Sequence, residues 1–368
     1  MRLRKLLPFL LLFSVVAADF SLAEKNPAAM QVRAEIARLQ KSRKEKTITD
    51  KNWVEVFSSV GDELRAANNE LDIGHLYLSV EKLGHAEDLL QGARRAVDRE
   101  AVEKGGFEAF QLDWGKVSVR LTELDKEARG HDWASTPLAI RALAESADTK
   151  AIPLLEGGLG FATANGPKDG LFYVGQAEGE ADFTSFASSL KFEAARTPSF
   201  ALRSMLPELH ALQVKTNAAF QPPKSIELHS RFIALNSTIK LAEELDAARF
   251  YVGALYVYLE ATRHYGMLGQ RPLDADEKAR LARQLPIEWK KLASSEKDES
   301  IAQLFVERAE SYTSHADGSA PSEDEWRSAQ IIVDQVLPAY EAALKPATQI
   351  AQAGGKTVGI TLVRWPYT

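Results

Sequence analysis

The sequence predicts an all-α fold of stacked helical hairpins, either an irregular α-solenoid or a bundle, with a short β-strand near the C-terminus. Three observations predict it. Apolar residues recur at intervals of three and four over most of the chain, as on one face of a helix. Glycine and proline are concentrated in a few places and are sparse between them. The 368 residues, 45% hydrophobic and 26% charged, are enough for one large core or two moderate ones.

The first 23 residues have the composition of a secretory signal peptide. A basic start (residues 1–5) precedes an apolar run (6–18), and Ser21-Leu22-Ala23 is a small-x-small cleavage site. The apolar run is shorter than the roughly 18 to 20 residues needed to span a bilayer. We therefore expect cleavage before Glu24 and a bacterial periplasmic or secreted protein without a membrane span; an uncleaved anchor is the alternative.

Composition excludes several classes of protein. The chain has no cysteine, which excludes disulfides, cysteine-based metal or redox sites and covalently attached haem. An exported protein without disulfides suits a bacterial periplasm. The formal net charge is −6, and removing the three basic residues and one acidic residue of the signal lowers it to about −8. An acidic surface repels phosphate backbones, so nucleic-acid binding is not expected.

Caps and breaks set the helix boundaries in chain order. Thr136-Pro137 combines a cap with proline at the first helical position, Ser322 with Glu325 forms a capping box, and Gly105-Gly106 ends a helix. The expected helices cover residues 27–46, 50–73, 75–104, 107–129, 137–146 with a short segment to 156, 168–190, 198–220, a helix from about 225, 246–268, 274–292, 298–315 and 322–344.

Two irregular stretches interrupt these helices. Residues 157–170 are rich in glycine and are expected to form the longest flexible loop. Pro222-Pro223 is a stiff break and predicts a subdomain boundary near residues 221–224. We therefore divide the chain into a signal peptide (1–23), a helical domain (24–346) and a C-terminal tail (347–368).

The segment 246–268 is apolar almost all round, which predicts a helix covered by neighbours on two sides at the centre of the body. Tyr251, Tyr258 and Tyr265 recur at seven and share one stripe of this helix. Buried tyrosine hydroxyls need hydrogen-bond partners. These rings are either core residues with satisfied hydroxyls or the lining of a groove for a peptide, a sugar chain or a small apolar ligand.

The tail contains a strand signal. Residues 356–364 are β-branched and alternate in polarity, which is typical of a strand. A lone strand leaves backbone groups unpaired. Residues 159–163 are the internal candidate partner; addition to the sheet edge of another chain and a disordered tail are the alternatives.

A short aromatic motif occurs twice, as Phe172-Tyr173-Val174-Gly175 and Phe250-Tyr251-Val252-Gly253. The segment 170–190 resembles the first helix of a tetratricopeptide repeat and the turn after it, with Phe172, Gly175 and Phe183 in the corresponding roles. This resemblance covers about 20 residues. It implies antiparallel helical hairpins stacked around a concave binding face, and it makes Phe172 and Tyr173 candidates for lining the groove. An irregular helical bundle is the alternative.

Chemistry-bearing motifs are few. Glu81, His85 and Asp88 share one helical face, and Glu260 and His264 are one turn apart. A pair one turn apart supplies two ligands, whereas zinc and iron sites need three or four, and ion pairing on the helix surface explains the spacing; both sets are therefore weak metal candidates. Gly354-Gly355-Lys356-Thr357 resembles the end of a phosphate-binding loop but lacks its first glycine and its strand–loop–helix order. We expect no cofactor and no metal.

These observations favour a non-catalytic binding or scaffolding protein of the periplasm, which docks a protein or peptide partner of the cell envelope. The alternatives are an enzyme acting on envelope polymers, with carboxylates meeting in a cleft between helices, and a carrier of a metal or small apolar ligand. An enzyme of the first kind requires two carboxylates about 5 to 10 Å apart in one cleft.

Overall fold

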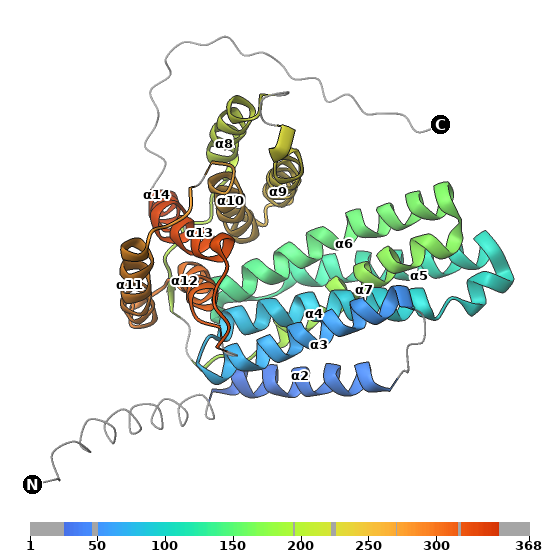
Figure 1. Cartoon of the computed structure of the whole chain (residues 1–368). Helices are drawn as coiled ribbons and strands as arrows, with labels where there is room; N and C mark the ends of the chain where they lie inside the picture. Colours follow the sequence, from blue (N-terminus) through green and yellow to red (C-terminus); the bar gives the residue numbers. More distant parts are fainter. Residues whose placement is uncertain are drawn as a thin grey trace, which may run out of the picture.

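The computed structural model describes residues 26–45, 51–193, 196–221, 226–269, 271–315 and 318–345, and these residues confirm the all-α class (Figure 1). The helices are α2 (Pro27–Lys44), α3 (Lys51–Asp72), α4 (Leu76–Val97), α5 (Glu100–Gly130), α6 (Leu138–Asn165), α7 (Pro167–Ser189), α8 (Leu206–Ala219), α9 (His229–Ala247), α10 (Tyr251–Gly266), α11 (Ala275–Ala293), α12 (Ser300–Thr313), α13 (Glu323–Ile331) and α14 (Leu337–Leu344).

Short elements connect the helices. They are the 3-10 turns η1 (Trp133–Ser135) and η2 (Ile226–Leu228), the π-helical segment η3 (Ile332–Val336), and two strands, β1 (Thr197–Pro198) and β2 (Lys297–Asp298). The two strands pair in parallel, Thr197 with Lys297 and Pro198 with Asp298. None of the described helices is both long and apolar enough to cross a membrane.

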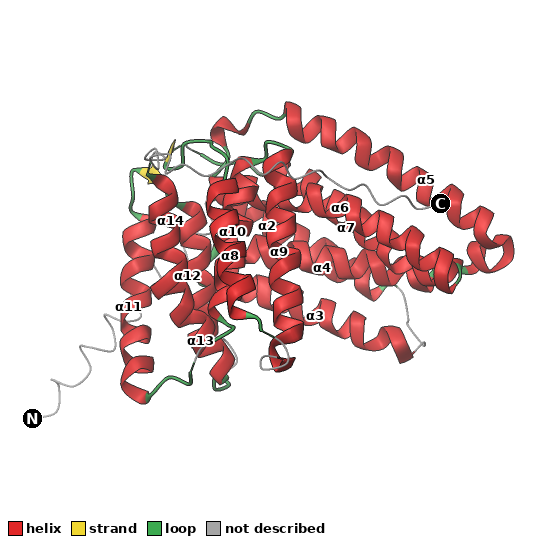
Figure 2. Cartoon of the chain, turned by 90° about the horizontal axis from the view of Figure 1, so that it is seen from above, coloured by secondary structure: helices red, strands yellow, loops and turns green. Residues whose placement is uncertain are grey.

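Helices α2–α7 lie side by side, and helices α8–α14 gather at one end of them (Figure 1). Seen from above, α8–α12 run across the direction of α4–α7 (Figure 2). One large hydrophobic core joins the two groups and contains buried residues from Ala29 to Ala343. It includes Leu209 and Leu235, which lie on either side of the predicted boundary at 221–224. A smaller core fills the space between α5, α6 and α7.

Helix α10 lies at the junction of the two groups, as its apolar sequence predicts. Val252, Leu255 and Leu259 are fully buried, and α10 packs against α6 and α9. Its first turn is fixed by Glu145 of α6, whose carboxylate accepts a 2.7 Å hydrogen bond from the Gly253 amide. The helix begins at Tyr251 rather than at residue 246, because Arg249 adopts φ 65° and closes the turn after α9.

The glycine-rich segment 157–170 is helical, so its prediction as a flexible loop is wrong. Helix α6 continues through it to Asn165, and only Gly166 takes a left-handed conformation, with φ 113°, before α7 starts. Two of the glycines, Gly158 and Gly170, lie at the contact between α6 and α7: a Cβ atom on Gly170 would lie 2.2 Å from the Gly158 carbonyl oxygen. Small residues therefore let α6 and α7 approach closely instead of breaking the helix.

This finding also corrects two related predictions. Residues 159–163 belong to α6 and their backbone groups are used within the helix, so they are not an edge strand for residues 356–364. The helix expected to end near residue 146 also continues, with Pro153 inside it. The expected signal peptide, the strand at 356–364, Gly354-Gly355-Lys356-Thr357 and Pro222-Pro223 lie outside the described residues.

Helices α4 and α7 touch backbone to backbone. A Cβ atom on Gly175 would lie 2.4 Å from the Gln91 carbonyl oxygen and 2.8 Å from Gly92 Cα, and one on Gly179 would lie 2.7 Å from Asp88 Cα. Only hydrogen atoms fit at these points of contact. Segment 170–190, which resembles part of a tetratricopeptide repeat, thus forms an uninterrupted helix through Ser189, with Gly175 at its closest contact.

A buried histidine ties α3, α4 and α12 together. The His75 side chain lies 2.8 Å from a Glu70 carboxylate oxygen through Nδ1 and 2.9 Å from a Glu310 oxygen through Nε2. Both ring nitrogens therefore donate, which requires the charged imidazolium. Burial by itself lowers the pKa of His75, but the two carboxylates outweigh burial and raise it to about 10.

This histidine predicts a pH dependence of stability. The folded state keeps a proton on His75 that the unfolded chain releases near pH 6.5, so the stabilisation is complete below pH 6.5 and is lost as the pH rises towards 10. We expect His75→Gln to lower the unfolding free energy by about 1.5 kcal/mol at pH 6. The difference should shrink by pH 10 in urea titrations followed by circular dichroism; a difference that stays constant over this range would contradict the assignment.

Candidate functional site

The central charged cluster consists of Glu81, Tyr256, Glu260, Arg263 and Arg308, from α4, α10 and α12. The Arg308 guanidinium is buried, with 7% of its side chain exposed, and forms ion pairs with both Glu81 and Glu260. The Tyr256 hydroxyl donates a 2.5 Å hydrogen bond to Glu81, and Arg263 pairs with Glu260 at 3.1 Å. Three helices from distant parts of the chain therefore meet at one buried guanidinium.

The electrostatics of this cluster keep its carboxylates ionised. Burial disfavours charged Glu81 and Glu260, but the neighbouring Arg308 charge outweighs this effect. The pKa of Glu81 is consequently lowered, and that of Glu260 falls to about 2. Burial, together with the charge of Glu81, raises the pKa of Tyr256, so its hydroxyl stays protonated as a donor.

The hydrogen bonds of His264 also determine which of its ring nitrogens carries a proton. Its Nε2 atom lies 2.9 Å from an Arg263 guanidinium nitrogen, which can only donate, so Nε2 accepts. Its Nδ1 atom carries the proton and donates to the Thr238 hydroxyl at 3.1 Å. Burial and the Arg263 charge lower the pKa of His264, which agrees with a neutral ring.

A cavity of about 430 Å³ borders this cluster, and we call it the central cavity. Its walls come from α3, α4, α6, α9, α10 and α12. Besides the cluster, its polar lining includes Glu63, Lys82, His85, Ser146, Lys150 and His264.

A larger opening, of about 1300 Å³, lies where several segments from distant parts of the chain meet, and we call it the aromatic cleft. Its walls come from the α3–α4 turn, the segment around η1, the chain after α7, α11 and β2. Its aromatic lining is Tyr77, Trp133, Phe192, Phe200 and Trp289.

Three of the four acidic residues that line the aromatic cleft have structural roles. Asp72 binds Arg33 at 2.7 Å and Asn68 at 3.0 Å. Asp132 accepts the amide of Ala134 at 3.0 Å and so begins η1. Asp298 accepts the Leu138 amide at 2.7 Å and caps α6. None of these three resembles a carboxylate held ready for acid or base chemistry.

The residues predicted to line a groove lie in two separate places. Tyr251, Tyr258 and Tyr265 are half-buried on α10 against the main core, and burial raises the pKa of Tyr258. Phe172 stacks on Trp53 of α3, with ring centroids 5.3 Å apart, and Tyr173 stacks on Phe161 of α6 at 4.5 Å. Neither the central cavity nor the aromatic cleft is lined by any of these five predicted residues.

Glu81, His85 and Asp88, the weak metal candidates, have different surroundings in the structure. Glu81 is held by Arg308 and Tyr256, His85 faces the central cavity, and Asp88 accepts a 3.3 Å hydrogen bond from Gln176 of α7. In the described part of the chain, no three His, Asp or Glu side chains are grouped so that they could hold a metal ion.

Sequence reasoning missed Arg308 and Tyr256 but had marked their neighbours. The pairs Glu81–His85 and Glu260–His264 were each noted as one turn apart, and the structure brings both pairs to the central cavity. Arg308 joins them from 227 residues after Glu81. The spacing of residues along one helix does not predict a contact with a residue so distant in the sequence.

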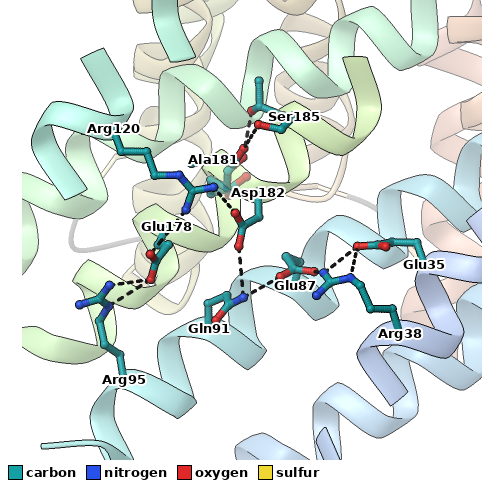
Figure 3. Close-up of polar contacts among 12 residues, drawn as sticks. Glu35, Arg38, Glu87, Gln91, Arg95, Arg120, Glu178, Ala181, Asp182 and Ser185 are labelled. Atoms are coloured by element: carbon teal, nitrogen blue, oxygen red, sulfur yellow. Dashed lines mark hydrogen bonds and ion pairs between the residues drawn. The ribbon is translucent and has the colours of Figure 1, made fainter. Parts of the chain in front are cut away.

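A chain of ion pairs and hydrogen bonds, which we call the ladder, connects α2, α4, α5 and α7 (Figure 3). Arg38 binds Glu35 and, at 2.9 Å, Glu87; Gln91 links Glu87 to Asp182. The ladder continues through Arg120, Glu178, Arg95 and Asp113. Burial raises the pKa of Glu87 to about 7. Each arginine faces carboxylates, so the ladder holds helices together rather than presenting free charge.

Comparisons of the chain with protein-family models, with curated proteins and with solved structures gave no match.

Proposed function

We propose that this chain is an exported, non-catalytic binding protein whose aromatic cleft holds an extended segment of a partner protein in the cell envelope. The observation that carries the proposal is the cleft itself, about 1300 Å³ in volume and lined by five aromatic side chains from separate parts of the chain. Pockets for small molecules measure about 300 to 1,000 Å³, so this volume suits several residues of a peptide.

The chemistry of the cleft indicates the kind of segment. Aromatic side chains are frequent anchors in protein interfaces because they bury a large area with little loss of conformational freedom. Arg196 also lines the cleft, donates to the Ala293 carbonyl at 3.1 Å and has no carboxylate partner among the described residues. A segment with apolar side chains and one acidic group would satisfy both features.

Two further observations support this function over an enzyme. Asp72, Asp132 and Asp298 in the cleft are committed to ion pairing or to capping. The expected signal peptide, at residues 1–23, supports export and therefore a partner in the envelope.

The proposal is tested by site-specific photo-crosslinking in envelope extracts. Leu202 lines the cleft and is 53% exposed, whereas Val119 of α5 is 61% exposed and lies outside it. A photoreactive residue at position 202 is expected to capture a discrete partner, identified by mass spectrometry, and one at position 119 is not.

Truncating an aromatic wall residue gives a second readout with the captured partner. We expect Trp133→Ala to weaken its binding at least tenfold, roughly the effect of losing one interface anchor. Trp114→Ala, which removes a half-buried tryptophan of α5 outside the cleft, serves as the matched control. Equal capture at both crosslinking positions, or unchanged binding by Trp133→Ala, would contradict the proposal.

A further inference from the structure

One wall of the central cavity carries polar groups that have no partner. Ser146 and Lys150 are one turn apart on α6, and His85 of α4 lies on the same cavity. Ser146 is 2% exposed and its hydroxyl has no hydrogen-bond partner, although buried hydroxyls are normally paired. The His85 side chain lines the cavity and, within the described residues, makes no hydrogen bond.

The side chains that line the cavity include one more cation than anions. Lys82 lies 3.8 Å from Glu63, and Arg263 and Arg308 pair with the carboxylates of the charged cluster. Lys150 has no carboxylate within 4 Å among the described residues. The lining thus holds four cationic and three anionic side chains, and the excess charge belongs to Lys150.

Burial disfavours the charged forms of the titratable groups next to Lys150 and around the cavity. Burial lowers the pKa of His85 and of His264, so both rings are neutral. Asp88 and Glu180 lie beside Lys150 outside the cavity lining, and burial raises the pKa of both, that of Asp88 to about 8. The Asp88 carboxyl is therefore held mainly in its neutral form near pH 7, and burial also disfavours the charged form of Glu180.

We propose that the central cavity binds a small monocarboxylate, whose carboxylate pairs with the Lys150 ammonium and accepts hydrogen bonds from the Ser146 hydroxyl and the His85 ring. The apolar part of the ligand lies against Leu241, Val257 and Tyr312, which line the same cavity. The volume of about 430 Å³ falls in the range of small-molecule pockets. One excess positive charge matches a carboxylate, whereas a phosphate dianion would leave one negative charge uncompensated.

Isothermal titration calorimetry with the purified protein at pH 7 tests the site. The probes are 3-phenylpropanoate and hexanoate, with 3-phenylpropanamide as the uncharged comparison and inorganic phosphate, a mixture of monoanion and dianion at pH 7, as the comparison without an apolar part. We expect at least one of the two carboxylates to bind saturably below about 10 mM. The amide is expected to bind at least tenfold more weakly, and phosphate not to bind.

Substitutions of Lys150 test whether the carboxylate binds in the central cavity. Lys150→Met should weaken carboxylate binding at least tenfold, while Lys150→Arg keeps the charge and should stay within threefold of the wild type. Lys215→Met, at an exposed lysine of α8, is the matched control and should have no effect. Circular dichroism of each variant establishes that it is folded.

Several results would overturn the assignment. These are the absence of carboxylate binding to the wild type, equal binding of the amide, tighter binding of phosphate, and wild-type affinity in folded Lys150→Met. The site is independent of the aromatic cleft, so the failure of one proposal leaves the other in place.

Discussion

Replacing Arg308 by methionine is expected to lower the free energy of unfolding by about 3 to 5 kcal/mol, since removing one partner of a buried ion pair leaves uncompensated buried charge. Glu81 and Glu260 would then face each other without the guanidinium that holds both of them ionised. Urea unfolding at pH 7, followed by circular dichroism, measures this loss.

Two further variants make the result specific. Arg65→Met removes an exposed ion pair, in which the Arg65 and Asp62 side chains are 72% and 61% exposed, and should change stability by less than about 1 kcal/mol. Combining Arg308→Met with Glu81→Gln and Glu260→Gln removes the stranded charges and should recover part of the loss. A loss no larger for Arg308→Met than for Arg65→Met would show that the charged cluster does not stabilise the fold.

The second large loss of stability is expected when one methyl group is added at Gly175. Gly175→Ala would place a carbon atom 2.4 Å from the Gln91 carbonyl oxygen and 2.8 Å from Gly92 Cα, so α4 and α7 must move apart. Overpacking of this kind costs about 1 to 3 kcal/mol, and we expect the upper part of this range because the clash is with backbone atoms. Urea unfolding measures the change.

Gly115 offers a matched control with the opposite sign. It lies inside α5, and a Cβ atom there would have no neighbour within 4 Å. Gly115→Ala should therefore stabilise the protein by up to about 1 kcal/mol through helix propensity alone. If both alanine variants change stability in the same direction, the close α4–α7 contact does not limit the side chain at position 175.

Local patterns in the sequence were sufficient for the helix class and for much of the helix order. The apolar residues of 246–268 identified the buried helix α10, and the capping box of Ser322 and Glu325 marked the start of α13. Gly106, which takes φ 57°, interrupts α5 at the predicted glycine pair. Each of these signals depends only on residues close together in the sequence.

Signals that depend on distant segments were misinterpreted or absent. Glycines at 157–170 are compatible with a flexible loop or with close helix packing, and only the presence of α7 decides between them. Tyr256 lies in an almost wholly apolar segment, and no local pattern marks its hydroxyl as part of a polar cluster because its partner Glu81 lies 175 residues away. The aromatic cleft likewise brings together Tyr77 of α4, Trp133 of η1 and Trp289 of α11, which no periodic pattern relates.

The distance along the chain between Glu81 and Arg308 has a consequence during synthesis. Long-range contacts form slowly because a long loop must close before the contact stabilises it. A nascent chain that has emerged only as far as α7 carries Glu81 without its counter-ion. Native packing around Glu81 therefore requires α12, and fragments of the chain that end before α12 should be more sensitive to proteases than the full chain.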